Sequence, residues 1–98
     1  MRKARNLVGN LITHNMIQGI NREYIFEKDE EKLKYLTLVK KYSEQYMISI
    51  IAYCIMDNHV HLLLHANDSK RLSLFMKEVN SRYAMYYNKK NERVRVCI

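Results

Sequence analysis

The chain of 98 residues is long enough for one domain with a single hydrophobic core, and 48% of its residues are apolar or aromatic. Seventeen Lys and Arg against ten Asp and Glu give a net charge of +7, which favours a polyanion as partner, nucleic acid before an anionic membrane. The alternative is a basic protein with a solvated surface. The lack of proline and the presence of only two glycines argue against a loop-rich all-β fold and a glycine-rich phosphate loop. No apolar run approaches the ~20 residues of a membrane helix, and none follows the basic N-terminus, so we expect neither a membrane span nor a signal peptide.

The chain begins with a short basic arm that contains Arg2, Lys3 and Arg5. This arm is either a disordered tail or an arm that contacts phosphates. The apolar and β-branched residues behind it predict a first strand over residues 11–18. His14 lies in that strand, where a single histidine is more often a structural residue than a ligand.

The next segment predicts an amphipathic helix over residues 30–45, with the apolar patch Tyr24–Phe26 in a turn packed under it. Asp29 is a candidate N-cap, and acidic residues in the first turn suit the helix dipole. The apolar residues recur at spacings of three and four. The lysines between them predict a solvated opposite face: Lys32, Lys34, Lys40 and Lys41.

A continuously apolar run, Met47–Met56, predicts a central strand. Cys54 lies in this run and is expected to be a buried thiol, since the two cysteines of the chain do not make a disulfide framework and suit a reducing cytoplasm. The polar step Asp57–Asn58 suits a tight turn into an antiparallel strand over residues 59–65.

The last part of the chain predicts a second amphipathic helix over residues 70–88, from apolar residues at helical spacing. The tail 93–98 alternates basic and apolar residues and is either a short edge strand or a loose end. The resulting order of strand, helix, two strands and helix predicts an α+β fold of the ferredoxin-like, or split βαβ, type. Two helices would cover one face of an antiparallel sheet and leave the other face open.

The pattern His-Val-His at residues 59–61 is the main candidate site, because strand residues two apart share a face. His59 and His61 would stand side by side on the open face, in line with Leu63 and His65. Three interpretations remain open from the spacing: a structural pair, a zinc site, and a catalytic divalent ion with open coordination positions. The zinc interpretation is weak, since Cys54 and Cys97 are not spaced as a zinc knuckle.

The run around these histidines resembles the signature of the REP-associated tyrosine transposases and their insertion-sequence relatives, within the HUH (His-hydrophobic-His) endonuclease superfamily. The resemblance extends over roughly residues 2–91. It rests on four stretches in register, of which the first is the most specific: Ala52–Leu64 around the histidines, Arg2–Arg5, His14–Phe26 and Tyr83–Lys90.

The resemblance implies an enzyme that binds single-stranded or hairpin DNA on the open sheet face. It implies that His59 and His61 hold Mg²⁺ or Mn²⁺, which polarises the scissile phosphate, and that a tyrosine hydroxyl attacks the phosphorus to give a phosphotyrosine link. Two reversible steps through a covalent intermediate conserve the bond energy. Imidazole is a more usual ligand for manganese than for magnesium, so we expect manganese to support activity well.

One departure from the family limits this expectation. The family's nucleophilic tyrosine lies on a later helix, and no matching segment precedes Ile98. We therefore expect a C-terminally truncated domain, residues 1–98, which carries the metal- and DNA-binding core without an assigned catalytic tyrosine. A homodimer that completes the site is an alternative. The resemblance implies that three tyrosines of the second helix are packing residues, namely Tyr83, Tyr86 and Tyr87.

Basic residues near the open face are candidates for phosphate contacts, in addition to the N-terminal arm: Arg22, Lys70, Arg71 and Arg82. If several act together, binding should weaken steeply with salt. The leading hypothesis is a cytoplasmic, metal-dependent single-strand DNA transposase core. The rivals are a DNA-binding remnant or regulator without catalysis and, less well supported, an RNA-binding domain, since Tyr53 is the only aromatic residue in the two predicted central strands.

Overall fold

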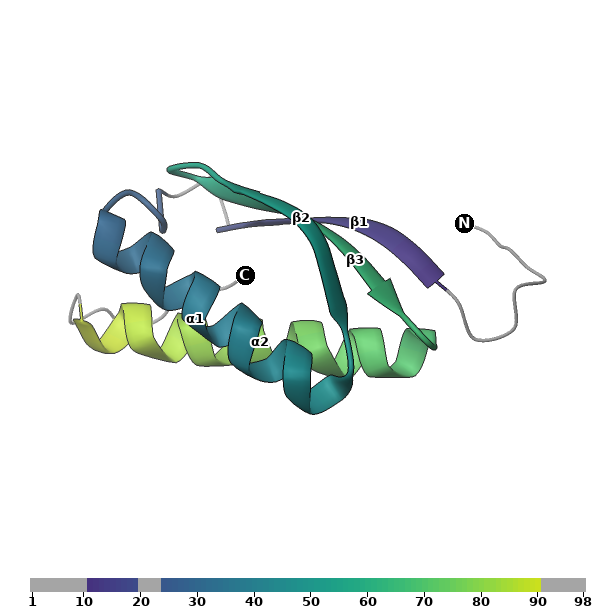
Figure 1. Cartoon of the computed structure of the whole chain (residues 1–98). Coiled ribbons are helices and arrows are strands. Elements are labelled where there is room, and N and C mark those ends of the chain that lie inside the picture. Colours follow the sequence, from purple (N-terminus) through teal and green to yellow (C-terminus); the bar gives the residue numbers. More distant parts are fainter. Residues whose placement is uncertain (1–10, 20–23, 91–98) are drawn as a thin grey trace.

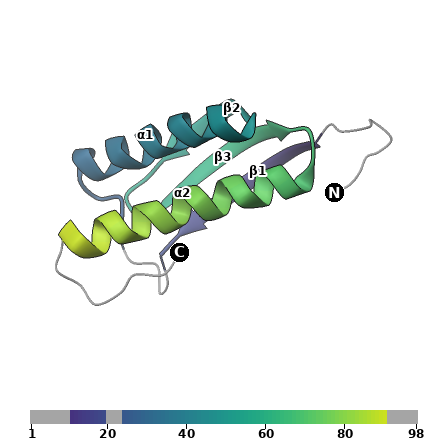
Figure 2. The ribbon, with the colours of Figure 1, turned by 90° about the horizontal axis from the view of Figure 1, so that it is seen from below.

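The computed structural model describes residues 11–19 and 24–90 and shows a three-stranded antiparallel sheet with two helices on one of its faces (Figure 1). The elements follow the order β1 (Leu11–Gln18), α1 (Asp29–Tyr46), β2 (Ser49–Ile55), β3 (His59–Ala66) and α2 (Ser69–Lys90). The strands lie in the order β1-β3-β2, so β3 is central. Seen from the helix side, α1 and α2 lie next to each other across the sheet (Figure 2).

The predicted α+β, ferredoxin-like arrangement is confirmed. The bounds of β1 agree with the prediction, and β3 and both helices extend one or two residues beyond it. The predicted tail strand, 93–98, lies outside the described residues. Within the described part of the chain, no helix is long and apolar enough to cross a membrane.

Alternation along β3 determines which face of the sheet meets the helices. Its even-numbered residues are buried, and its odd-numbered residues, which include His59 and His61, are only partly buried. The buried set packs with side chains from both helices in one core. Its largest fully buried members are Tyr35, Val39, Val60, Leu62, Leu64, Phe75, Val79 and Tyr83, with Ile25 and Phe26 from the segment before α1. The histidines therefore lie on the face away from the helices.

The start of α1 differs from the prediction. Asp29 is the first helical residue and not the N-cap, which is Lys28 in extended conformation. Glu31, in the first turn, is almost completely buried and accepts a hydrogen bond from the Lys28 backbone N–H at 3.0 Å. Its other oxygen receives the Lys90 ammonium at 3.2 Å, which joins the start of α1 to the end of α2. A glutamate in the third helical position can thus cap the helix even when the N-cap residue is not an Asp.

The prediction of a buried, central β2 is wrong. Among the described strands β2 is an edge strand that pairs only with β3, and its ladder shifts by one residue at Ile51. Most of its side chains are exposed, and the Cys54 thiol is among them. A continuous apolar run is typical of a strand that is buried on both faces. Here the run forms an edge strand, in which Ile50 and Ile55 pack against the core, and Ile48, just before the strand, is buried in it.

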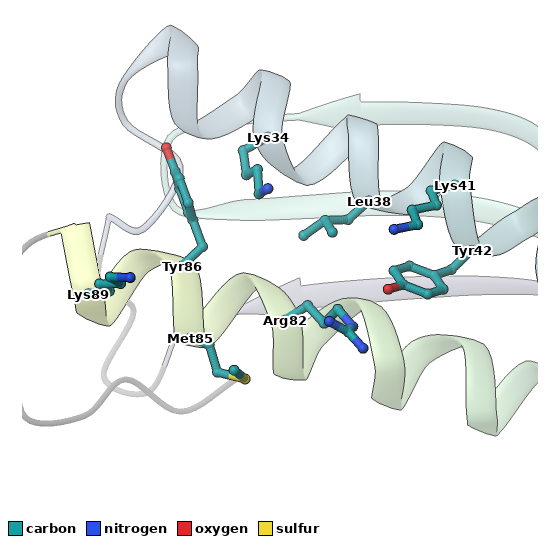
Figure 3. Close-up of a pocket in the computed structure, with 8 residues that line it drawn as sticks. All are labelled: Lys34, Leu38, Lys41, Tyr42, Arg82, Met85, Tyr86 and Lys89. Atoms are coloured by element: carbon teal, nitrogen blue, oxygen red, sulfur yellow. The ribbon is translucent and has the colours of Figure 1, made fainter.

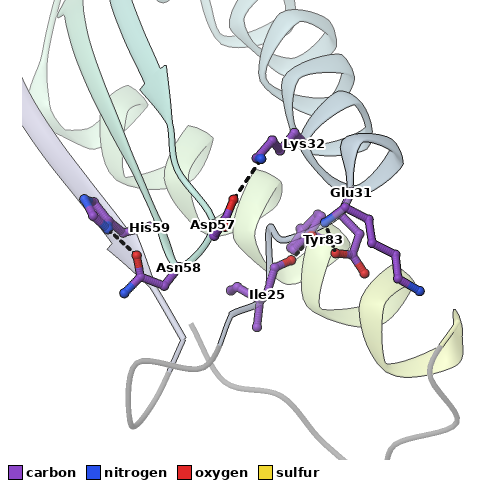
Figure 4. Close-up of polar contacts among 8 residues, drawn as sticks. Ile25, Glu31, Lys32, Asp57, Asn58, His59 and Tyr83 are labelled. Atoms are coloured by element: carbon purple, nitrogen blue, oxygen red, sulfur yellow. Dashed lines mark hydrogen bonds and ion pairs between the residues drawn. The ribbon is translucent and has the colours of Figure 1, made fainter.

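Two of the three residues in the predicted apolar patch before α1 pack into the core, whereas Tyr24 is exposed. Ile25 and Phe26 are completely buried. The Phe26 backbone N–H bonds to the carbonyl of Asp57 at 2.9 Å, and the Tyr83 hydroxyl donates to the carbonyl of Ile25 (Figure 4). The segment is therefore fixed both to α2 and to the β2–β3 turn that precedes the histidines. Of the three tyrosines predicted to pack, Tyr83 and Tyr87 are in the core and Tyr86 packs against it, which confirms that interpretation.

Candidate metal centre and basic groove

The open face of the sheet is lined by side chains from all three strands in a regular grid. Cross-strand partners in a sheet project to the same side. The pairing of Met16 and Cys54 with His61, and of His14 and Ala52 with Leu63, therefore places these side chains on the histidine face. Gln18 pairs with His59 at the end of the face nearest the β2–β3 turn.

The first histidine of the pair is held by its neighbour in sequence. His59 Nδ1 lies 2.7 Å from the side-chain oxygen of Asn58 (Figure 4). An amide oxygen only accepts hydrogen bonds, so the proton of the neutral imidazole is on Nδ1. The lone pair of His59 is then on Nε2, where it is available to a metal ion.

The second histidine of the pair is held from β1. His61 Nδ1 lies 2.9 Å from His14 Nε2. The two ring planes are parallel within 2° and the ring centroids are 5.0 Å apart. Because the nitrogen atoms are much closer than the ring centres, the rings meet edge to edge through a hydrogen bond and do not stack face to face. From the sequence, a single strand histidine such as His14 is more often structural than a ligand. The signal that could have singled it out is its position on the same face of β1 as Met16, which becomes informative once the β1–β3 register is known.

The geometry of His59 and His61 suits two ligands of one ion. Their ring centroids are 4.8 Å apart and their planes are nearly perpendicular, at 84°. Two imidazoles that share an ion through metal–nitrogen bonds of about 2.1 Å have ring centres about 4.5–5.5 Å apart. Within residues 11–19 and 24–90, no group of three or more His, Cys, Asp or Glu is arranged to hold a metal ion. The described residues thus offer two imidazoles, and an ion bound to them would keep open positions for other ligands.

A shallow cavity of about 190 Å³ adjoins the histidines on the open face. Its lining residues come from all three strands and are His14, Ala52, Tyr53, Cys54, His61 and Leu63. Tyr53 also contributes to this lining and is half-exposed, but it pairs with Leu62, so the register places its side chain on the opposite face of the sheet from His61. In the core, Tyr35 and Tyr83 are poor nucleophiles, since burial raises the pKa of both phenols and their hydroxyls donate to Asn80 and to the carbonyl of Ile25.

The predicted DNA-binding residues that the structure describes do not gather around the histidines. Arg2, Lys3, Arg5 and Arg22 lie outside the described residues. Lys70, Arg71 and Arg82 are on α2, which covers the opposite face of the sheet. Arg71 bonds to Asp68 and to the Met47 sulfur, and Arg82 pairs with Glu78. The hydrogen bond to Glu78 raises the pKa of the Arg82 guanidinium.

Arg82 instead belongs to a basic groove between α1 and α2 (Figure 3). The groove has a volume of about 360 Å³, and none of the residues that line it is acidic. Two lysine ammonium groups lie over tyrosine rings, Lys34 over Tyr86 at 5.4 Å and Lys41 over Tyr42 at 5.3 Å. The eight lining residues are Lys34, Leu38, Lys41, Tyr42, Arg82, Met85, Tyr86 and Lys89. We call this set the basic groove.

Comparison with known families identifies the chain. A family model described as "Transposase IS200 like" matches residues 7–97, nearly the whole sequence. The chain belongs to the IS200-like transposase family. No curated protein sequence matches it. Among solved structures, it is similar to a candidate transposase from Deinococcus radiodurans R1, with a TM-score of 0.68 and 23% identity over 92% of this chain and 68% of that chain.

Membership of the IS200-like transposase family supports transposition of DNA as the function, with DNA as the partner. The family is generally dependent on a divalent metal ion. The similarity to the solved structure is at an identity that supports the fold alone, and this fold agrees with the three strands and two helices described above. The family match covers all four histidines of the sequence, His14, His59, His61 and His65.

Proposed function

We propose that this chain is the metal- and DNA-binding core of a single-strand DNA transposase, and that His59 and His61 hold its Mn²⁺ or Mg²⁺ ion. The observation that carries the proposal is the pair of imidazoles on the open face. In His59 and in His61 the Nδ1 atom is in a hydrogen bond, and the Nε2 atom, on the other side of the ring, is directed away from it. When bound, the ion supplies Lewis-acid polarisation of a phosphate oxygen. Manganese suits the two nitrogen ligands better than magnesium.

The protein's own contribution at this site is rigid placement. Both histidines lie on the central strand, which is paired on each side, so their relative position is fixed by two ladders. The apolar neighbours Leu63 and Ala52 line the adjoining cavity. A DNA strand on this face would therefore meet a metal site on a rigid sheet, next to a small apolar hollow.

The reaction proposed is nicking and strand transfer of single-stranded or hairpin DNA through a phosphotyrosine intermediate. We assign the nucleophile to none of the eight tyrosines of this chain. Incubation with hairpin DNA and Mn²⁺ is expected to give no covalent protein–DNA adduct, as judged by denaturing electrophoresis. An adduct would contradict this assignment, and peptide mapping would then identify the tyrosine that carries the DNA.

Phosphate contacts outside the metal site are assigned to two groups of basic residues. The first is the set from the sequence: Arg2, Lys3, Arg5, Arg22, Lys70, Arg71 and Arg82. The second is the basic groove, which shares Arg82 with it and adds three lysines. Because Lys70, Arg71 and the groove lie on the helix layer, DNA that reaches them from the histidine face would have to pass around an edge of the sheet. A homodimer and a cytoplasmic location are part of the same proposal.

The metal site is tested by replacing both histidines. His59→Ala with His61→Ala is expected to abolish Mn²⁺ binding in calorimetry while leaving the fold intact, because both side chains are on the open face and outside the core. His65→Ala, four residues beyond His61 on the same face of β3, is the control and should bind Mn²⁺ like the unmodified chain. Unchanged binding in the double variant would overturn the assignment of the metal ligands.

The second candidate function is a DNA-binding regulator without catalysis. The observation that favours it is the basic groove, which lies away from the histidines and needs no metal. Affinity for hairpin DNA in EDTA, compared between the unmodified chain and the double histidine variant, separates the two. Equal affinity in all conditions, with no role for Mn²⁺, would favour the regulator.

A further inference from the structure

We propose that His14 is a positioning residue for the metal centre, which accepts the Nδ1–H of His61 and so leaves the Nε2 lone pair of His61 free for the ion. The inference rests on the proposed function, since it concerns the state in which His61 can act as a ligand. It assigns a specific role to a side chain from β1, which the sequence pattern of the two metal ligands does not include.

The hydrogen bond between these rings has two possible directions, and only one is compatible with a ligand. If His61 donates from Nδ1 to His14 Nε2, its own Nε2 carries no hydrogen and can bind a cation. If His14 donates instead, the neutral His61 carries its proton on Nε2, where it blocks coordination. The tautomer of His14 therefore decides whether His61 is a ligand, and the proposal requires the proton of neutral His14 to be on Nδ1.

The neighbouring histidine shows the same arrangement with a simpler partner. His59 Nδ1 faces the side-chain oxygen of Asn58 at 2.7 Å, and an amide oxygen accepts without ambiguity. Both candidate ligands thus form a hydrogen bond through Nδ1. The partner of His59 is its neighbour in sequence, and the partner of His61 is on the adjacent strand β1. Ligating histidines commonly have such a partner on the second ring nitrogen, which fixes ring orientation, and its loss costs about 10–100-fold in metal affinity.

His14 is well placed to do this because of the strand register. In the antiparallel pair of β1 and β3, His61 lies opposite Met16, and His14 is two residues further along β1 on the same face. The diagonal places one imidazole beside the other at 2.9 Å. Both strands are fixed by their ladder, so the contact does not depend on a mobile loop.

The proposal is tested with three variants of β1. His14→Ala removes the acceptor and is expected to weaken Mn²⁺ binding in calorimetry by about 10–100-fold. His14→Gln supplies an amide oxygen, as Asn58 does for His59, and is expected to restore most of that affinity. Met16→Ala is the matched control, since Met16 is exposed on the same face opposite His61 but has no polar group. It should bind Mn²⁺ like the unmodified chain.

A readout independent of metal loading is the tautomer of His61, observed by long-range ¹H–¹⁵N NMR of the imidazole rings without metal. The unmodified chain and His14→Gln should show the proton on Nδ1 of His61, and His14→Ala should show a mixture of tautomers. Unchanged affinity and tautomer in His14→Ala would overturn the proposal, as would an equal loss of affinity in all three variants, which would indicate a general effect on β1. If the unmodified chain binds no Mn²⁺, the proposed function fails, while the NMR experiment still decides the contact between the rings.

Discussion

At the scale of single residues, buried hydroxyl groups connect the irregular segment before α1 to the helices. The Tyr83 hydroxyl donates to the backbone carbonyl of Ile25, and neither residue is accessible to solvent. The Tyr35 hydroxyl donates to the side-chain oxygen of Asn80 at 2.8 Å and so joins α1 to α2. These phenols fill the core with their rings and satisfy polar groups with their tips, which is why tyrosine, and not phenylalanine, suits both positions.

Tyr83→Phe is expected to lower the free energy of unfolding by about 1–3 kcal/mol, because the Ile25 carbonyl would remain buried without a donor. Urea denaturation monitored by circular dichroism measures the loss. Tyr86→Phe serves as the control on the same helix, since its side chain is only partly buried and should change stability by much less. Equal effects of the two substitutions would contradict the importance assigned to the Ile25 contact.

Residue identity alone gave an incomplete account of the candidate site. The spacing of His59 and His61 was sufficient to place them on one face of a strand, because side-chain direction alternates by a fixed rule. The role of His14 could not be derived in this way, since it depends on the alignment of two strands 47 positions apart. The prediction of a buried Cys54 is wrong for a related reason: its neighbours are apolar, but it pairs with His61 and so lies on the open face, in a strand that is at an edge among the described strands.

At the scale of elements, the two helices bring four basic side chains together in the basic groove. Lys34 and Lys41 from α1 face Arg82 and Lys89 from α2 across the basic groove (Figure 3). Contacts with tyrosine rings hold the two α1 lysines near the groove without neutralising them. The sequence predicted a solvated lysine face on α1. It did not predict that two of these four lysines, Lys34 and Lys41, would lie across a groove from basic residues of α2.

Lys34→Ala with Lys41→Ala is expected to weaken binding of single-stranded DNA and to reduce its dependence on salt. If each lysine neutralises one phosphate, the slope of log K against log salt should fall by about 1.4. Fluorescence anisotropy in EDTA, at several salt concentrations, measures this without a contribution from the metal site.

Lys40→Ala with Lys77→Ala is the control for the loss of charge. These two lysines are exposed on the same two helices but do not line the groove. The net charge of the two double variants is identical, so only position distinguishes them. Equal losses of affinity would show that general charge, and not the groove, attracts the DNA.

Helix boundaries were predictable because local rules decide them, whereas the position of β2 in the sheet was not. Apolar spacing located α1 and α2 to within two residues at each end. For β2, the same apolar residues are compatible with a central or an edge strand, and the choice depends on which strand pairs with which. The order β1-β3-β2 results from the crossover of the split βαβ pattern, which is a property of the whole fold.

At the scale of the whole molecule, the core contains ionisable groups that make its stability sensitive to alkaline pH. Burial raises the pKa of Tyr35 and Tyr83, so both phenols stay protonated in the folded chain at pH values where the unfolded chain, with a phenol pKa of about 10, releases protons. The unfolded state then binds fewer protons than the native state. The free energy of unfolding is therefore unaffected by these groups below about pH 10 and falls as pH rises above it.

Tyr35→Phe is expected to make this alkaline fall shallower, by at most about 1.4 kcal/mol per pH unit, because one linked group is removed. Urea denaturation between pH 8 and 12 measures the change, when the slope of the free energy of unfolding against pH is compared between the two chains. Tyr24→Phe, at an exposed position before α1, controls for the loss of a phenol. An unchanged slope in Tyr35→Phe would contradict the assigned linkage.

The hydrogen bond between His14 and His61 also has a consequence for the order of folding events. Its partners are 47 residues apart, whereas α1, β2 and β3 are consecutive in the chain. Closure of a long loop is entropically costly, so contacts of large sequence separation tend to form after local ones. During synthesis, β1 emerges first and must wait for β3 before it can pair. We therefore expect the candidate metal centre to be completed late in folding, when β1 docks, and a probe at His14 would report that last step.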